Sequence, residues 1–241
     1  MIDKKSPLPM YYQIEENIKQ RISNGDYQPS DMIPSERELS DTYKVSRMTV
    51  RQAINNMVNK GILFREKGKG TFVSAKKIEQ PLKGLTSFTE DMQARGMKPS
   101  SKLVSFNKIG ASAELARKFE REEGELVFQI KRIRYADGKT MAIENSYIPV
   151  ELLPDLTEQV VSGSIYDYVE KTLKQSIGKA SQFIEASIAE DSQSAMLQIP
   201  PDSAILNIER NTFLADGTPF EVVNSSYRAD RYKFISDIYR V

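Results

Sequence analysis

The chain has 241 residues, 39% of them hydrophobic and 28% charged, with a formal net charge of +1, which suits one large folded domain or two ordinary ones. It contains no Cys and no His, which excludes disulfides, thiol nucleophiles, imidazole metal sites and Ser-His triads, so we expect neither a metal nor a cofactor. No stretch approaches the roughly 18 apolar residues of a membrane span, and the N-terminus lacks the apolar segment of a signal peptide, so we expect a cytoplasmic protein with no membrane contact.

Residues 9–24 predict a first helix. Tyr12, Ile14, Ile18 and Ile22 recur at a spacing close to the helical repeat and are expected to form its buried side. Gly25 is expected to end the helix. Such a helix would support the next elements from behind.

Residues 35–61 predict two more helices joined by a short turn. Ser35 and Glu38 form an S-x-x-E capping box that starts the first of them, which is expected to run to Tyr43. Ser46 is a good N-cap for the second helix. The apolar stripe of this second helix consists of Val50, Ile54 and Met57.

A basic hairpin follows these helices. Residues 62–64 and 71–73 predict two short strands, and residues 65–70 (REKGKG) form the turn between them. Between Lys44 and Lys69 the chain has seven Lys or Arg residues and a single acidic residue. Helix, turn, helix and hairpin in this order predict a winged helix-turn-helix.

The second helix of this unit has side chains suited to reading DNA. Arg47 and Arg51 lie four residues apart on a face away from the apolar stripe, with Thr49 and Gln52 beside them. Arg can bind guanine, and Gln adenine, through two hydrogen bonds in the major groove. The turn 68–70 (GKG) has little bulk and a Lys for phosphate. The alternative is a solvated helix with an ordinary loop, which fits a single Arg better than it fits the whole ordered set.

This stretch resembles the DNA-binding domain of the GntR family of bacterial transcription factors. Residues 34–39 (PSEREL), 46–53 (SRMTVRQA) and 68–73 (GKGTFV) carry the resemblance, which covers about residues 8–74. It implies binding to double-stranded DNA through a common set of residues: Ser35, Arg37, Ser46, Arg47, Thr49, Arg51, Gln52, Gly68, Lys69 and Gly70.

Composition changes after the hairpin. Residues 1–74 are predicted to be the DNA-binding domain, 75–84 (AKKIEQPLKG) a polar linker, and 85–241 a second domain. A surface loop inside one domain is the alternative for 75–84. The basic excess is modest but gathers beside the second helix of the DNA-binding domain, where local concentration matters for phosphate binding.

The sequence of the second domain predicts a mixture of helices and antiparallel strands, which is an α+β fold. The expected helices are residues 85–96, 113–119, 164–173 and 191–198. The expected strands are residues 101–108, 182–189 and 236–241, with hairpins over 126–147 and 204–227 around Ala-Asp-Gly turns.

The hairpin over 126–147 predicts an anion pocket. Phe128, Ile130, Arg132 and Arg134 alternate onto one face, so a core face ends in two arginines. Ser164 is expected to cap a helix whose N-terminus favours a phosphate. From the pattern alone, pairing of the arginines with surface acids is favoured over an anion pocket. Carboxylates on nearby strands are suitable acceptors for sugar hydroxyls, or else ordinary solvated strand residues.

The second domain resembles the UTRA-like effector domain of the HutC branch of the GntR family, whose fold is similar to chorismate lyase. Residues 85–92 (LTSFTEDM), 132–134 (RIR), 142–144 (AIE) and 164–167 (SIYD) carry this resemblance. Within the branch the chain is similar to regulators of N-acetylglucosamine use. This implies a pocket for glucosamine 6-phosphate or N-acetylglucosamine 6-phosphate, lined by Ser87, Phe88, Thr89, Arg132, Arg134, Ser164 and Tyr166 near the phosphate and by Glu144, Glu221 and Tyr227 near the sugar.

The resulting hypothesis is a repressor of amino-sugar utilisation genes that binds a palindromic operator as a homodimer and is not an enzyme. The alternatives are a GntR-type regulator of a different small acid or sugar phosphate, an enzyme attached to a DNA tether, and a second domain that only dimerises. No paired-carboxylate or metal-ligand spacing supports the enzyme, and a fold similar to a lyase does not establish lyase activity.

Overall fold

The structure, a computed structural model, describes residues 3, 6–66, 68–74, 77–238 and 240. Its internal contacts divide the chain into two compact units, Met1–Ile78 and Glu79–Val241. Each unit has its own hydrophobic core, so each is described by itself.

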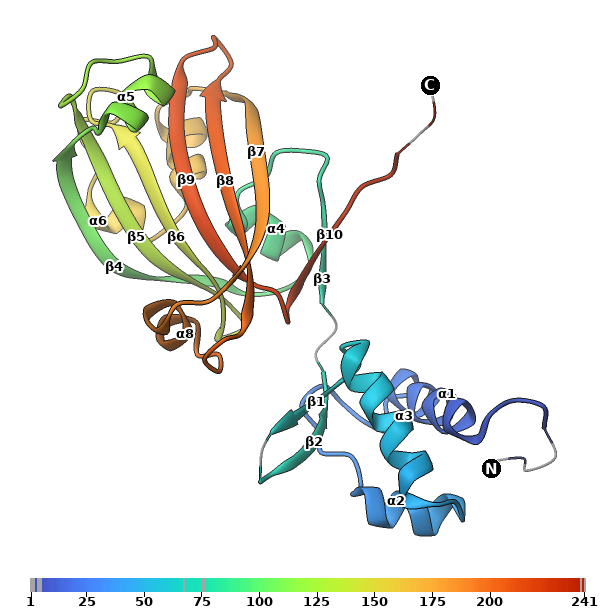
Figure 1. Ribbon diagram of the computed structural model, residues 1–241. Coiled ribbons are helices and arrows are strands. Elements are labelled where there is room, and N and C mark those ends of the chain that lie inside the picture. The colour runs from blue at the N-terminus through green and yellow to red at the C-terminus, as the bar shows by residue number, and fades with distance from the viewer. Residues whose placement is uncertain (1–2, 4–5, 67, 75–76, 239, 241) are drawn as a thin grey trace. The chain divides into compact units, whose positions relative to one another are not determined.

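The first unit has the helix and strand order of a winged helix-turn-helix, as predicted (Figure 1). Its elements are α1 (Met10–Ser23), α2 (Glu36–Tyr43), α3 (Arg47–Asn59), β1 (Leu63–Glu66) and β2 (Gly70–Val73). Strands β1 and β2 are antiparallel, with Leu63 opposite Val73. The buried apolar stripe of α3 packs with side chains from the other elements in one core: Ile14, Ile18, Ile33, Leu39, Val50, Ala53, Ile54, Met57, Leu63 and Val73.

The buried side of α1 differs from the prediction at one residue. Tyr12 is 40% exposed, whereas Glu15 is fully buried. The Glu15 carboxylate accepts hydrogen bonds from Asn56 Nδ2 at 2.8 Å and from Lys60 Nζ at 2.6 Å. Burial of Glu15 is therefore compensated by polar partners on and just after α3, a long-range pairing that the periodicity of α1 does not reveal.

We expect a Glu15→Gln variant to loosen the packing of α1 against α3. Burial alone would raise the pKa of Glu15, but the hydrogen bonds from Lys60 and Asn56 outweigh it and lower the pKa. A lowered pKa means that this carboxylate stabilises the fold above its ordinary pKa and that the contribution is lost as the pH falls. At pH 7 the amides of α1 and α3 in the full chain should exchange hydrogen faster in the variant. The free energy of opening derived from these rates should be lower by about 1–3 kcal/mol. The difference should shrink toward pH 4; an equal difference at both pH values would contradict the assignment.

The second unit is built on a six-stranded antiparallel sheet in the order β4-β5-β6-β9-β8-β7. The strands are β4 (Pro99–Gly110), β5 (Leu126–Ala136), β6 (Lys139–Pro149), β7 (Ile177–Ile188), β8 (Ala204–Leu214) and β9 (Pro219–Arg228). The helices are α4 (Phe88–Ala94), α5 (Ala113–Phe119), α6 (Glu158–Val161), α7 (Ile165–Asp167), a π-helical turn (Tyr168–Thr172) and α8 (Asp191–Leu197). The α+β fold class and both central hairpins are as predicted.

Helices cover both faces of the sheet (Figure 1). On one face, α6, α7 and the π-helical turn pack on Phe128, Ile130 and Ile148. On the opposite face, α5 packs near Val127, and α8 packs near Ile143. Because side chains alternate along β5, the arginines that follow Ile130 in steps of two lie on the first of these faces.

Two segments differ from their predictions. Part of the expected linker is a strand, β3 (Ile78–Pro81), which pairs with β10 (Tyr232–Ile235) near the other end of the chain. The prediction of a strand over 236–241 is wrong, because β10 ends at Ile235. Residues 239 and 241 of that range lie outside the described residues. Pairing between segments about 150 residues apart depends on the tertiary fold, which local composition does not encode.

Candidate functional site

The open surface of α3 presents the residues predicted to contact DNA. Ser46 caps this helix, since its Oγ accepts a hydrogen bond from the backbone N–H of Thr49 at 3.2 Å. Thr49 is half-buried, and the other predicted contact residues are all exposed: Ser35, Arg37, Ser46, Arg47, Arg51, Gln52, Gly68, Lys69 and Gly70. The surface therefore offers Arg and Gln side chains without a cost in core packing.

Glu36, in the first turn of α2, holds two cations of this surface. Its Oε2 accepts a hydrogen bond from Arg51 Nε at 2.9 Å, and its Oε1 accepts one from Arg65 Nη2 at 3.2 Å. Exposed ion pairs of this kind add little stability. Their effect is to orient one guanidinium on α3 and one on the hairpin relative to α2.

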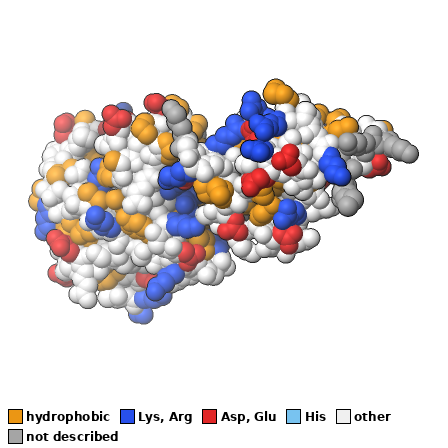
Figure 2. Space-filling model, turned by 90° about the horizontal axis from the view of Figure 1, so that it is seen from below, with side chains coloured by type: hydrophobic (Ala, Val, Ile, Leu, Met, Phe, Trp, Pro, Cys, Tyr) orange, Lys and Arg blue, Asp and Glu red, His pale blue; other side chains and the backbone are white. Residues whose placement is uncertain are grey.

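The hairpin turn is slender and basic. Gly70 has φ +146°, and a Cβ added there would lie 2.9 Å from Met32 Sδ, so the strand passes close to the loop before α2. Lys69 Nζ lies 2.9 Å from Glu66 Oε2, while Lys67 lies outside the described residues. Lys and Arg side chains gather on the unit that contains these elements (Figure 2). A basic hairpin beside an exposed helix is the geometry of a winged helix on DNA.

In the second unit, two buried arginines share one buried carboxylate. Arg132 on β5 lies opposite Glu144 on β6, and Arg134 follows on the same face. Arg132, Arg134 and Glu144 are 5%, 3% and 7% exposed. Oε2 of Glu144 lies 3.1 Å from Arg132 Nη2 and 3.6 Å from Arg134 Nε. One carboxylate thus faces two guanidinium charges, which leaves this cluster with excess positive charge.

Each of these guanidinium groups keeps one donor without an acceptor in the described part of the chain. Nε of Arg132 and Nε of Arg134 are both buried and make no hydrogen bond, although Arg134 Nε lies within ion-pair distance of Glu144. Arg132 Nη1 donates to the carbonyl of Val161 at 3.0 Å, and Arg134 Nη2 donates to Thr89 Oγ1 at 3.2 Å. The Arg134 guanidinium also lies 4.6 Å from the centre of the Phe88 ring. Buried donors in native structures normally have acceptors, so the two Nε–H groups make this cluster a candidate for binding an anion.

Two adjoining hollows of about 40 Å³ each surround this cluster. The first is lined by these predicted effector residues: Ser87, Phe88, Arg132, Arg134, Glu144, Ser164, Tyr166 and Glu221. The second is lined by Tyr227 and shares Ser87, Phe88 and Glu144 with the first. Thr89 joins them through its hydrogen bond with Arg134. A hollow this small holds about one water molecule, so a sugar phosphate requires the walls to move apart.

The two carboxylates of the site differ in charge state. Burial would raise the pKa of Glu144, but the charges of Arg134 and Arg132 outweigh it and lower the pKa. Burial raises the pKa of Glu221, which the charge of Arg132 offsets only in part. Glu144 therefore stays ionised as the counter-ion of the arginines. Glu221 is the carboxyl that takes up a proton more readily and can exchange hydrogen bonds with a ligand hydroxyl.

Two tyrosines supply neutral phenol groups. Tyr166 Oη and Thr212 Oγ1 lie 3.1 Å apart, and the Tyr227 ring packs edge-on against Tyr232 with centroids 4.7 Å apart. Burial raises the pKa of Tyr166 and raises that of Tyr227 to about 12. Both phenols are thus protonated near neutral pH and can donate hydrogen bonds to a ligand.

The helix expected over 164–173 is shorter and less regular than predicted. Ser164 caps it as expected, since its Oγ accepts from the backbone N–H of Asp167 at 3.2 Å. The α-helical part is only Ile165–Asp167, and a π-helical turn follows over Tyr168–Thr172. Ile165 and Val169 are both buried in the core, one on each side of the change. A helix of three residues has little dipole, so an anion at this end would be held mainly by side chains.

Arg210 is a site residue that the sequence analysis missed. It lies on β8 opposite Val223 of β9, and it lines both hollows. Thr212 on β8 lies two residues after Arg210, and Glu221 on β9 is the pairing partner of Thr212. These side chains therefore face the same side of the sheet as Arg210. The alternation that picked out Glu221 and Tyr227 on the second strand of the 204–227 hairpin could have identified Arg210, had it been extended to the first strand.

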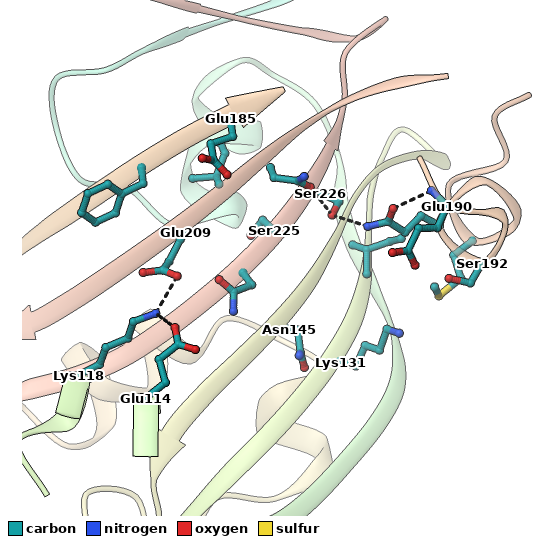
Figure 3. Close-up of a pocket in the computed structure, with 17 residues that line it drawn as sticks. Glu114, Lys118, Lys131, Asn145, Glu185, Glu190, Ser192, Glu209, Ser225 and Ser226 are labelled. Atoms are coloured by element: carbon teal, nitrogen blue, oxygen red, sulfur yellow. Dashed lines mark hydrogen bonds and ion pairs between the residues drawn. The ribbon is translucent and has the colours of Figure 1, made fainter. Parts of the chain in front are cut away.

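A larger hollow of about 730 Å³ lies on the opposite face of the sheet (Figure 3). Lys118 Nζ in this hollow already binds Glu114 Oε1 at 2.6 Å and Glu209 Oε2 at 2.8 Å. Glu185 and Glu190 add further negative charge. Carboxylates outnumber the cations in its lining, so a phosphate would be repelled here, and the two small hollows remain the candidate site.

Within the described residues, no cluster of three or more acidic side chains could hold a metal ion. The helices in the same part of the chain are all too short or too polar to cross a membrane.

Two family profiles match the chain. The profile described as "Bacterial regulatory proteins, gntR family" matches residues 10–73, and the profile described as "UTRA domain" matches residues 94–233. The first match covers the exposed α3 surface and the basic hairpin. The second covers the whole six-stranded sheet.

Known proteins of this kind match nearly the whole chain. The HTH-type transcriptional repressor NagR of Bacillus subtilis is 47% identical, over 97% of this chain and 96% of its own. The mannosyl-D-glycerate transport/metabolism system repressor MngR of Escherichia coli is 34% identical, over 94% of each chain. The crystal structure of PhnF from Mycobacterium smegmatis is similar with a TM-score of 0.66 and 25% identity, over 94% of this chain and 99% of that one.

Proposed function

Since the chain belongs to the gntR family of bacterial regulatory proteins, in its HutC-type branch with a UTRA domain, we propose that this DNA-binding transcription regulator represses amino-sugar utilisation genes under the control of a hexosamine 6-phosphate. The observation that supports the ligand proposal is that the buried Nε–H groups of Arg132 and Arg134 make no hydrogen bond, beside the single carboxylate that the two arginines share. Charge-assisted hydrogen bonds from guanidinium groups suit a phosphate well. The resemblance to amino-sugar regulators and the 47% identity to the NagR repressor favour glucosamine 6-phosphate or N-acetylglucosamine 6-phosphate.

The sugar part of this ligand has suitable partners in the same hollows. Glu144 and Glu221 offer carboxylate oxygens, and Tyr227 offers a phenol that is neutral near pH 7. Hexose hydroxyls both donate and accept hydrogen bonds, so acceptors and donors are both needed.

On DNA, we propose that the regulator acts as a homodimer on a palindromic operator in the cytoplasm. One winged unit covers a half-site, and two units related by a twofold axis read two inverted half-sites. Direct base contacts are assigned to Arg47, Arg51 and Gln52, and phosphate contacts to Lys69 and its neighbours in the turn.

Ligand binding is proposed to act on the segment that enters the second unit. Ser87 and Phe88 at the start of α4 line both hollows, and Gln80 of β3 lines one of them. Because the hollows are too small for a sugar phosphate, an occupant displaces some of these walls. Residues 80–88 follow directly on the first unit in the chain, so a change in their arrangement is the simplest route from ligand to DNA binding.

We expect glucosamine 6-phosphate or N-acetylglucosamine 6-phosphate to change operator affinity by about 5- to 150-fold, the usual range of allosteric coupling. The measurement is an operator titration of the full chain with and without each sugar phosphate. Linkage requires the operator to change the affinity for the sugar phosphate by the same factor, which calorimetry can check. Absence of binding by either sugar phosphate at millimolar concentration would remove the ligand assignment but leave the DNA assignment standing.

An enzyme on a DNA tether is the alternative from another class, and we propose that this site is not catalytic. Without His or Cys, proton transfer would depend on Glu144, Glu221, a Lys or a Tyr. Glu144 is held as a counter-ion by two arginines, which makes it a poor base. Turnover of either sugar phosphate by the purified chain would favour the enzyme. Tight binding of some other sugar phosphate or small acid would favour a regulator with a different effector.

A further inference from the structure

Arg210 differs from the other two arginines of the site in its partners. Its Nη2 and Nε donate to Gln182 Oε1 at 2.8 Å and 3.0 Å, and its Nη1 donates to the carbonyl of Thr86 at 3.3 Å. All of these acceptors are neutral. Within the described residues no carboxylate forms an ion pair with Arg210, whereas Arg132 and Arg134 share Glu144.

The first hollow therefore has an unbalanced charge. Three guanidinium groups line it, those of Arg132, Arg134 and Arg210, against the carboxyl groups of Glu144 and Glu221. Removing charge from water without a counter-ion is costly, so a fold that keeps such an excess needs a reason for it. A phosphate monoester carries about −1.5 to −2 charges at pH 7, which is the sign of charge that would offset the excess in the hollow.

We infer that Arg210 is a third anion-binding residue of the effector site, whose guanidinium donates to a phosphate oxygen of the ligand. This inference rests on the proposed function, since it assigns a further partner to the same hexosamine 6-phosphate. Arg210 can bind the phosphate without giving up an ion pair, because its hydrogen bonds go to an amide and a carbonyl. Arg132 and Arg134 instead divide their donors between the ligand and Glu144.

The contact with Thr86 gives this role a structural consequence. Thr86 immediately precedes Ser87, which caps α4 through a hydrogen bond with Glu90. The bond from Arg210 Nη1 to the Thr86 carbonyl, at 3.3 Å, is the longest of its three. A phosphate oxygen that takes over this donor frees the Thr86 carbonyl at the wall that must move when the site fills.

The test is calorimetry of glucosamine 6-phosphate with the full chain and four variants. Arg210→Gln removes the charge, and Arg210→Lys keeps the charge but not the two-pronged bond to Gln182. Gln182→Ala removes the neutral partner and leaves the guanidinium. Arg117→Gln, at an exposed position on α5, has the same change in net charge away from the hollows.

We expect Arg210→Gln to weaken binding about 10- to 100-fold, the effect of losing a hydrogen bond to a charged group. Arg210→Lys, Gln182→Ala and Arg117→Gln should stay within about 5-fold of the parent, since each keeps a positive charge in the hollow. If Arg210→Lys and Gln182→Ala lose as much affinity as Arg210→Gln, the residue only positions the strands, and the inference is wrong. If Arg210→Gln binds as tightly as the parent, the inference is wrong while the proposed function stands. If the parent itself binds no hexosamine 6-phosphate, both fail.

Discussion

An Arg134→Gln variant will bind operator DNA as the parent does but will lose its response to hexosamine 6-phosphates. The Nε–H of Arg134 is buried and makes no hydrogen bond, while its Nη2 donates to Thr89 Oγ1. Its removal leaves the Arg132–Glu144 ion pair, at 3.1 Å, in place. The loss of a hydrogen bond to a charged phosphate should weaken ligand binding about 10- to 100-fold. Operator affinity should change less than about 3-fold, since no residue of the first unit is altered.

A single substitution is the better test because it leaves Glu144 with one of its two arginine partners. Replacing both Arg132 and Arg134 by Ala would leave this buried carboxylate without a partner, which typically costs about 3–5 kcal/mol. Loss of ligand binding could then reflect loss of the fold. Adding Glu144→Gln to the double variant removes the stranded charge and gives a matched control for stability. Operator release by N-acetylglucosamine 6-phosphate in the Arg134→Gln variant, at the concentration that works for the parent, would show that the phosphate lies elsewhere.

Alternation along β5 was enough to predict which side chains share the face of the candidate site. Arg132 and Arg134 follow Phe128 and Ile130 in steps of two, and all four are buried on one face. The pattern could not decide whether the arginines bind an anion or an acid of the chain. In the structure the two arginines pair with an acid of the chain, Glu144, and their Nε–H groups still make no hydrogen bond.

Long-range pairings account for what the sequence did not reveal. Arg210 comes beside Glu144 only because β8 pairs with β9, and β9 in turn pairs with β6. Strand β3 forms only because β10 returns to it from the far end of the chain. Gln80, Tyr232 and Phe234 from these two strands line the second hollow. Local periodicity detects faces of single elements, and it carries no information about which distant element pairs with them.

The winged unit could be predicted almost completely because its signals are local. The capping box of Ser35 and Glu38 is present, with the Ser35 backbone N–H donating to Glu38 Oε2 at 2.8 Å. The stripe of α3 is buried as its spacing indicates. Glu36 escaped notice because its partners, Arg51 and Arg65, are 15 and 29 residues away.

An Arg47→Ala variant will bind the operator more weakly, by about 1–3 kcal/mol, and will discriminate less between bases at one position of each half-site. Arg47 is exposed at the first turn of α3, where a recognition helix places its base contacts. Its loss leaves the core and the effector site untouched, so the response to the sugar phosphate should keep its size. The measurement is a competition series with operators changed at single base pairs, for the parent and the variant.

Lys69→Ala is the matched comparison, because it removes a cation from the same surface without removing a base contact. A phosphate contact releases counter-ions, so its loss should lower the slope of log affinity against log salt by about 0.9 per contact on duplex DNA. Lys69 already pairs with the exposed Glu66 at 2.9 Å, and that competition makes a smaller decrease the expected result. Base discrimination should stay as in the parent. If Arg47→Ala keeps full discrimination while Lys69→Ala loses it, the wing reads the bases, and the assignment of α3 as the recognition helix is wrong.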